Sequence, residues 1–186
     1  MSSSDSGRTV RSRLQPARVL PLLAVGVSLA LGGCFRPLYG TSPTGHNVAD
    51  QLASVDVVVL PKTSQERLAH YVEQELRFNL NGSGRPSSKA YRFELDLSQE
   101  VLTSSVNQTT GQAVAAILRI KANYKLIEGG STKVLAEGSA SASAGYDRTP
   151  QRYSNLRAAR DAEIRASKVL AEQLQTKLAG WFVSRP

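Results

Sequence analysis

The sequence holds few of the side chains from which metal and catalytic sites are built. Its 186 residues include one cysteine and two histidines. One cysteine cannot form an intramolecular disulfide, so a disulfide-stapled fold is excluded. The histidines, His46 and His70, lie 24 positions apart, and His70 has no second ligand four residues further along its predicted helix. We therefore expect neither a metal site nor a bound cofactor.

Long apolar runs are scarce as well. One run stands out, residues 19–31, and its 13 residues fall short of the roughly 20 that a membrane-spanning helix needs. A multi-pass membrane protein is therefore excluded. The composition is otherwise that of a globular protein, with 41% apolar and 20% charged residues, and this speaks against wholesale disorder.

The sequence also lacks an evenly spread basic charge. The net charge is +8, but residues 1–33 carry four arginines against Asp5 and contribute +3 of that total. The remaining +5 is spread over residues 34–186. The basic character of the chain therefore gives little support to nucleic-acid binding, and we expect no nucleic-acid partner.

What the N-terminus does have is the three-part layout of a secretory signal, in which arginines precede an apolar run that ends in small residues. The run ends Leu31-Gly32-Gly33-Cys34, a pattern that resembles the bacterial lipobox. In lipobox proteins, signal peptidase II cuts before the cysteine, and acyl chains on that cysteine anchor the mature chain. We predict that residues 1–33 are a lipoprotein signal peptide and that Cys34 is lipidated. A buried free cysteine beside an uncleaved anchor is the alternative.

Phe35, and not aspartate, follows the cysteine. By analogy with sorting rules in enteric bacteria, this favours the cell outer membrane, with the protein lipid-anchored on its periplasmic side. Residues 34–52 are rich in Pro, Gly, Ser and Thr, and we predict that they form the lipidated N-terminus and a tether. The folded domain is then expected at 53–182, with 183–186 as a tail.

Alternation of apolar and polar residues predicts four strands in this domain. They cover 53–60, 91–98, 118–126 and 132–146, and the polar residues 103–112 are expected to form a long turn. The middle of the last strand alternates alanine with serine, so a low-complexity linker is the alternative there. Alanines on one face of a strand would let a helix approach the sheet closely.

Two amphipathic helices are predicted around these strands. The first begins at a capping box formed by Thr63 and Glu66, ends at Asn81-Gly82, and has apolar residues four positions apart. These residues are Leu68, Val72, Leu76 and Leu80.

The second helix covers about 151–182, and its first half breaks the apolar stripe. Its apolar stripe is made of Leu156, Leu170, Ala171, Leu174, Leu178 and Trp181. Arg160, Glu163 and Ser167 fall on the same stripe. Either the first half of this helix leaves the sheet or meets another surface, or Arg160 and Glu163 form a buried pair.

The order strand, helix, three strands, helix predicts an α+β fold. Consecutive strands joined by turns pair antiparallel, and amphipathic helices bury their apolar face on one side of the sheet. We expect a two-layer sandwich, with a four-stranded, mainly antiparallel sheet and two helices on one face.

No arrangement of residues proposes a reaction. The segment 141–145 lacks the first glycine of the G-x-S-x-G nucleophile elbow. The segment 82–87 lacks the third glycine of G-x-G-x-x-G and follows a helix instead of a strand. The chain is therefore expected not to be an enzyme.

One short segment is distinctive. It reads Cys34-Phe35-Arg36-Pro37-Leu38-Tyr39-Gly40 and resembles the start of the mature LPS-assembly lipoprotein LptE family, in which a glycine separates the cysteine from Phe-Arg-Pro-Leu-Tyr-Gly. This chain lacks that glycine. Tyr146 and Asp161-Ala162 also look like family features, and the family's fold is similar to the order of elements predicted above.

The resemblance implies a non-enzymatic outer-membrane lipoprotein. Such proteins sit as a plug inside the outer-membrane barrel LptD, help that barrel to assemble, and bind lipopolysaccharide during its insertion into the outer leaflet. A different reading from the residues is a periplasmic-facing lipoprotein that carries or presents a lipid without a barrel partner. A carrier needs an apolar cavity of several hundred cubic ångströms, whereas a plug does not.

The third predicted strand supplies candidate lipopolysaccharide-binding residues. Arg119, Lys121 and Lys125 point the same way if their apolar neighbours face the core, because side chains alternate along a strand. Lipid A carries phosphates, which arginine contacts bidentately and lysine contacts as a point charge. The alternative is a solvated face whose cations pair with Glu94 or Asp96, or contact the barrel wall, since exposed pairs contribute only ~0–1 kcal/mol.

The lipobox makes a direct prediction for Cys34. The substitution Cys34→Ala removes the acyl acceptor, so radioactive palmitate should no longer label the protein and the domain should be released from membranes. Labelling of the wild-type chain in the same cells is the control. Palmitate that still labels the variant would show that Cys34 is not the lipidated residue.

Overall fold

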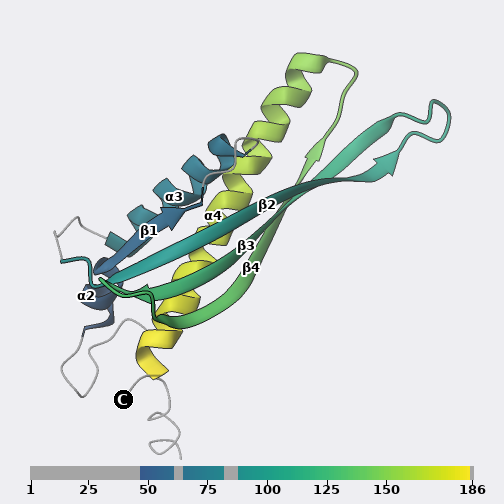
Figure 1. Cartoon of the computed structure of the whole chain (residues 1–186). Helices are drawn as coiled ribbons and strands as arrows, with labels where there is room; N and C mark the ends of the chain where they lie inside the picture. The colour runs from purple at the N-terminus through teal and green to yellow at the C-terminus, as the bar shows by residue number, and fades with distance from the viewer. Residues whose placement is uncertain (1–46, 61–64, 82–87, 185–186) are drawn as a thin grey trace, which may run out of the picture. The chain divides into compact units, whose positions relative to one another are not determined.

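The computed structural model describes residues 47–60, 65–81 and 88–184, which form seven helices and strands (Figure 1). In chain order they are α2 (Val48–Ala53), β1 (Val55–Val59), α3 (Glu66–Asn81), β2 (Tyr91–Val106), β3 (Ala113–Glu128), β4 (Val134–Asp147) and α4 (Arg152–Ser184). The predicted signal peptide, Cys34 and the capping residue Thr63 lie outside the described residues.

The four strands form one sheet in the order β1-β2-β3-β4. β1 and β2 are parallel, since α3 connects them as a crossover, and the other two pairs are antiparallel. α3 packs against β1, and α4 packs against β3 and β4. The predicted α+β fold with a mainly antiparallel sheet is confirmed, and the alanine–serine stretch is a strand and not a linker.

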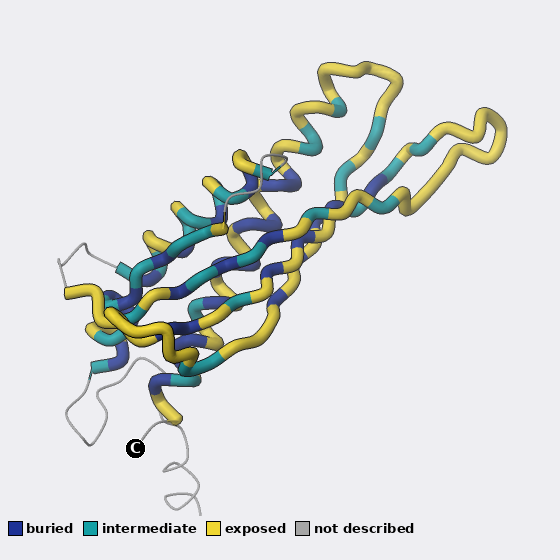
Figure 2. The backbone as a smooth tube through the Cα atoms, viewed as in Figure 1, coloured by how far each residue is buried: buried dark blue, intermediate teal, exposed yellow. Residues whose placement is uncertain are grey.

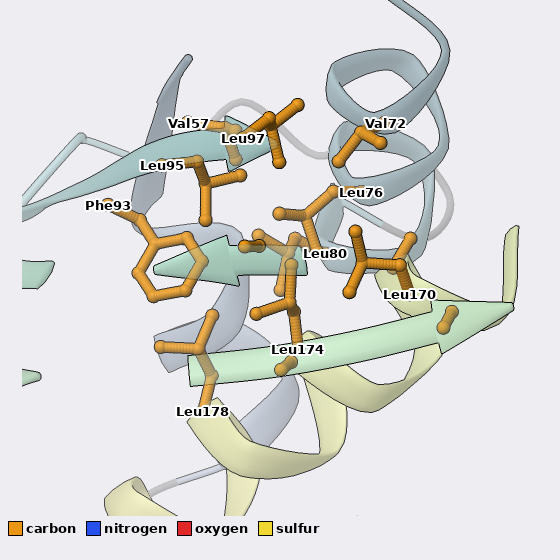
Figure 3. Close-up of a cluster of buried hydrophobic side chains, with 14 of the residues drawn as sticks. Val57, Val72, Leu76, Leu80, Phe93, Leu95, Leu97, Leu170, Leu174 and Leu178 are labelled. Atoms are coloured by element: carbon orange, nitrogen blue, oxygen red, sulfur yellow. The ribbon is translucent and has the colours of Figure 1, made fainter. Parts of the chain in front are cut away.

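The core lies between the sheet and the two long helices (Figure 3). All four apolar residues predicted on the face of α3 are buried, with Val72 and Leu76 fully so. Phe93 and Leu95 of β2 and Leu174 of α4 are also fully buried. Ala140, Ala142 and Ala144 of β4 are 6–7% exposed, and α4 packs against this face, as their small size permits.

Both free edges of the sheet are partly closed by arginines from the helices. Arg77 of α3 donates to the Val57 carbonyl of β1 at 2.8 Å. Arg165 of α4 donates to the Gly145 carbonyl of β4 at 2.9 Å. Unpaired edge groups invite pairing with another chain, so these contacts protect the sheet and also hold each helix in place.

The folded region begins earlier than the predicted boundary at residue 53. Residues 48–52, expected in the tether, and residue 53, expected in the first strand, form helix α2, and its Val48, Leu52 and Ala53 are buried. The Asn47 side chain accepts a hydrogen bond from the Ala49 amide at 3.0 Å and caps the helix. At the other end, α4 extends to Ser184, two residues beyond the predicted domain.

The expected long turn at 103–112 is wrong in extent. β2 runs to Val106 and β3 starts at Ala113, so the turn is short and the hairpin projects past the end of β4 (Figure 1). The polar residues of this segment are exposed on both faces (Figure 2). Sequence alternation fails here because the segment has no buried face to reveal.

The first turns of α4 leave the sheet, as one of the two readings of its polar residues proposed. Residues 152–161 contain no buried side chain, and Leu156, predicted on the apolar stripe, is 61% exposed. The alternative Arg160–Glu163 pair is wrong. Glu163 is buried, but its partner is Arg67 of α3, at 2.8 Å. The periodicity of apolar residues within one helix cannot identify a partner that comes from another element.

No helix within the described ranges has both the length and the apolarity needed to cross a membrane.

The two halves of α4 should respond differently to truncation. Leu174→Ala opens a cavity in the core and should lower the free energy of unfolding by about 2–5 kcal/mol. Leu156→Ala, the matched control on the same helix, should change it by no more than about 0.5 kcal/mol because the side chain is exposed. Chemical denaturation of both variants measures this. An equal loss in both would mean that the first turns of α4 are packed.

Candidate functional site

Charge is segregated at one end of the domain. We call this the distal end and define it as residues 101–118 of the β2–β3 hairpin together with residues 148–160 (Figure 1). Residues 101–118 contain no charged side chain, and residues 148–160 contain four arginines and no acid. The two segments are joined where the Arg148 amide donates to the Val114 carbonyl at 2.8 Å. One end of the molecule therefore carries four arginines and an uncharged hairpin segment, flanked by the exposed Asp147, which stands in register with Ala115.

The tip of the hairpin is rich in hydroxyl and amide groups. Asn107 shapes the turn, since its side chain accepts from the amides of Thr109 and Thr110 at 2.9 and 3.1 Å. Gly111 has a φ of +68°, the left-handed region that glycine adopts readily. The other polar side chains of the tip are exposed, so they are available to hydrogen-bond an uncharged polar ligand.

Two of the distal arginines lie against tyrosine rings. The Arg148 guanidinium is 5.7 Å from the ring centroid of Tyr146, and Arg157 is 5.7 Å from that of Tyr153. Arg157 also donates to the Tyr153 hydroxyl at 3.1 Å. Arg148 likewise donates to the Tyr146 hydroxyl at 3.2 Å, so each tyrosine limits the orientations of its arginine.

The start of α4 adds to the positive potential. Asn155 and Thr149 bond each other reciprocally at 2.7 Å, the Thr149 amide donating to the Asn155 side chain and that side chain to the Thr149 carbonyl. The first turn of α4 contains no acidic residue. The positive end of the helix dipole is therefore not neutralised within α4. Asp161, the nearest acid along the helix, is engaged by Arg165 at 2.7 Å.

Apolar side chains stand among these cations. Tyr153 is 70% and Leu156 61% exposed on α4, and the hairpin exposes Val101, Val106 and Val114. Isolated exposed apolar residues are common on protein surfaces. Here they share one end with an acid-free cluster of arginines. The distal end therefore combines arginine, hydroxyl and exposed apolar groups.

The cations predicted on the third strand lie on the opposite face of the sheet from the helices. Arg119, Lys121 and Lys125 of β3 are all exposed, and their apolar neighbours face the core as expected. Arg119 is 3.8 Å from Glu100 of β2, and not beside Glu94 or Asp96.

Acidic residues surround this row. Lys125 stands in register with Glu94 on one side and Glu137 on the other, whereas Lys121 stands between Ser98 and Ser141. By strand alternation, the same face carries the cations Arg92, Arg119, Lys121 and Lys125 and the acids Asp56, Glu94, Asp96, Glu100, Glu137 and Asp147. The row is thus balanced by its neighbours, and its attraction for a distant anion is weaker than that of the distal end.

Within 47–60, 65–81 and 88–184, no three His, Cys, Asp or Glu side chains are grouped to hold a metal ion. The lipidation candidate Cys34 lies outside these ranges. What the arrangement supports is recognition of an anion.

Sequence reasoning did not single out the distal arginines. The signal was present as four arginines without an acid between residues 147 and 161. Only Arg160 was named, as a polar residue on the apolar stripe of the last predicted helix. Their meaning depends on two structural facts, the exposure of this part of α4 and the neighbouring uncharged hairpin (Figure 2).

No protein-family model and no curated protein matches the chain. Among solved structures, it is similar to a "putative lipoprotein" from Caulobacter crescentus CB15, with a TM-score of 0.58 and 23% identity over 74% of this chain and 97% of that one. At that identity the similarity establishes a shared fold. Rare lipoprotein B from Shewanella oneidensis matches with a TM-score of 0.42 and 16% identity, over 70% of this chain and 93% of that one. A TM-score below 0.5 carries no inference.

Proposed function

We propose that this chain is an outer-membrane lipoprotein, not an enzyme, that binds lipopolysaccharide through its distal end and forms a plug-like complex with the barrel LptD. In this role it aids barrel assembly and the insertion of lipopolysaccharide into the outer leaflet. The choice of lipopolysaccharide as the ligand rests on the four arginines at residues 148–160, a segment that contains no acid and that Arg148 joins to the uncharged hairpin. The lipobox and the segment from Cys34 to Gly40 support the anchor and the family.

Lipopolysaccharide fits the distal end by its chemistry. Lipid A offers phosphates to the guanidinium groups, which bind phosphate with paired hydrogen bonds. Its sugars offer hydroxyl groups to the neutral side chains around Asn107, and its acyl chains can contact apolar side chains such as Leu156. A soluble polyanion would use the arginines alone and would leave the exposed apolar groups without a partner.

A barrel partner would account for the polar face of the sheet. In the described part of the chain no element covers this face, which carries alternating acids and bases. The inner wall of a transmembrane barrel is polar, so a charged face of this kind matches it without burying unpaired apolar surface. An interface enclosed by a barrel is large, and obligate interfaces commonly exceed about 2,000 Å².

The carrier reading has less support. Three hollows lie between described residues, with volumes of about 520, 570 and 680 Å³, and each is lined by charged side chains. None of the three is the apolar cavity that a carrier of acyl chains needs. The apolar interior itself is filled by side chains that are fully buried, such as Val72, Leu76 and Leu174.

The binding site can be located with two matched double variants of the purified domain. Arg152→Glu with Arg157→Glu should weaken binding to lipopolysaccharide by about tenfold or more, since it removes two charge-assisted contacts. Arg119→Glu with Lys121→Glu makes the same change of charge on the sheet face and should weaken binding less. Titration at low and at physiological salt measures both.

Three results would decide between the readings. Distal variants that bind like the wild type would exclude the distal end. A greater loss in the sheet-face variants would place the site on β3, as the sequence alone predicted. A wild-type domain that does not bind lipopolysaccharide in either salt would contradict the proposed function.

A further inference from the structure

A buried carboxylate lies at the point where α4 leaves the body of the domain. Glu163 is 5% exposed, and in the described chain Ser167 is the other polar residue that is buried. Both carboxylate oxygens accept hydrogen bonds from Arg67, one from Nε and one from Nη2, each at 2.8 Å. The side-chain amide nitrogen of Gln99, on β2, donates to Oε1 of the same carboxylate at 3.4 Å. The hydrogen bond to Glu163 also raises the pKa of Arg67.

Other polar contacts are made by residues of α4 within two positions of Glu163. Arg165, two residues further on, donates to the Gly145 carbonyl of β4 and pairs with Asp161 at 2.7 Å. Within one turn α4 is therefore tied to α3, β2 and β4. Before this level α4 has ten residues, 152–161, without a buried side chain. An isolated helix of that length is marginal in water, so its form and direction depend on this junction.

The junction around Arg67 and Glu163 is not closely packed on every side. A hollow of about 520 Å³ lies against it, lined in part by Gln65, Gln99, Val101 and the Arg67–Glu163 pair. Apolar contacts resist separation, but they are not directional and allow a helix to rotate or slide. A bidentate guanidinium–carboxylate pair fixes both distance and orientation.

We propose that Arg67 and Glu163 are positioning residues for the distal end. Their ion pair sets the direction in which the first turns of α4 leave the sheet, and so sets the positions of Arg152, Arg157 and Arg160 at the distal end. Neither residue needs to touch the ligand. The link to binding rests on the proposed lipopolysaccharide function, whereas the positioning itself is a property of the protein without ligand.

Hydrogen exchange and binding together test the proposal on the whole domain. Glu163→Gln keeps the size of the side chain but sets amide hydrogens against the donors of Arg67. In the absence of ligand, amides within residues 152–161 should exchange about tenfold faster or more, because a charge-assisted contact is lost. Amides around Leu174 should keep their protection. Lipopolysaccharide binding should weaken by a similar factor.

Two further variants separate positioning from stability. Arg67→Met with Glu163→Met removes both charges, so no buried charge is left unpaired and the domain should fold even if Glu163→Gln does not. It should still show fast exchange at 152–161 and weak binding. Exchanging the two residues, Arg67→Glu with Glu163→Arg, restores opposite charges and should recover at least part of both.

Arg77 provides the matched control on the same helix. It pairs with Glu73 at 3.0 Å and bonds the Val57 carbonyl, at the other end of α3. Arg77→Gln also removes an ion pair and should lower the melting temperature, yet leave exchange at 152–161 and binding unchanged.

The outcomes are distinguishable. The proposal would be overturned if amides at 152–161 exchanged at the wild-type rate in the variant that carries Arg67→Met and Glu163→Met. Packing alone would then suffice to position the first turns of α4. Equal acceleration in Arg77→Gln would also overturn it, as a general effect of lost stability. Acceleration at 152–161 in a domain whose wild type does not bind lipopolysaccharide would sustain the positioning role and contradict the proposed function instead.

Discussion

The packing of α4 across the narrow alanine face of β4 is the contact on which the rest of the domain depends. Small side chains at Ala140, Ala142 and Ala144 let the helix lie close to the sheet, and Leu174 and Leu178 of α4 are buried in the same core. The buried stripe begins at Ala162, although the helix begins at Arg152. A helix of 33 residues is about 50 Å long, so roughly the first third of it stands outside the core. This division creates a stable body and an exposed end.

The exposed end is where charge is not balanced. The other arginines that the structure describes have partners of opposite sign, as Arg67 has in Glu163 and Arg119 in Glu100. Pairs as exposed as Arg119 and Glu100 contribute little to stability, but they neutralise the field of the sheet face. At residues 148–160 two of the four arginines, Arg148 and Arg157, lie over tyrosine rings instead, and a ring does not cancel their charge. A partner that brings phosphate to this end would neutralise it.

The sequence predicted the elements that have one buried and one wet face, because periodicity records that contrast. The four strands, α3 and the second half of α4 were located in this way, including the alanine–serine strand. Periodicity failed at the outer part of the β2–β3 hairpin, where neither face is buried. It also failed at Leu156, because the apolar stripe of α4 continues beyond the part of the helix that packs on the core. The partner of Glu163 could not be predicted, since Arg67 is 96 residues away. The run of arginines without an acid is visible in the sequence, but its exposure is known only from the structure.

The most direct test of this account is site-specific photo-crosslinking in living cells. A photoreactive residue in place of Tyr153, which is 70% exposed at the distal end, should form an adduct with lipopolysaccharide. The same residue in place of Lys121, on the sheet face, should form an adduct with the LptD barrel and little with lipopolysaccharide. Lipopolysaccharide captured at Lys121 but not at Tyr153 would contradict the central claim that the distal end binds it.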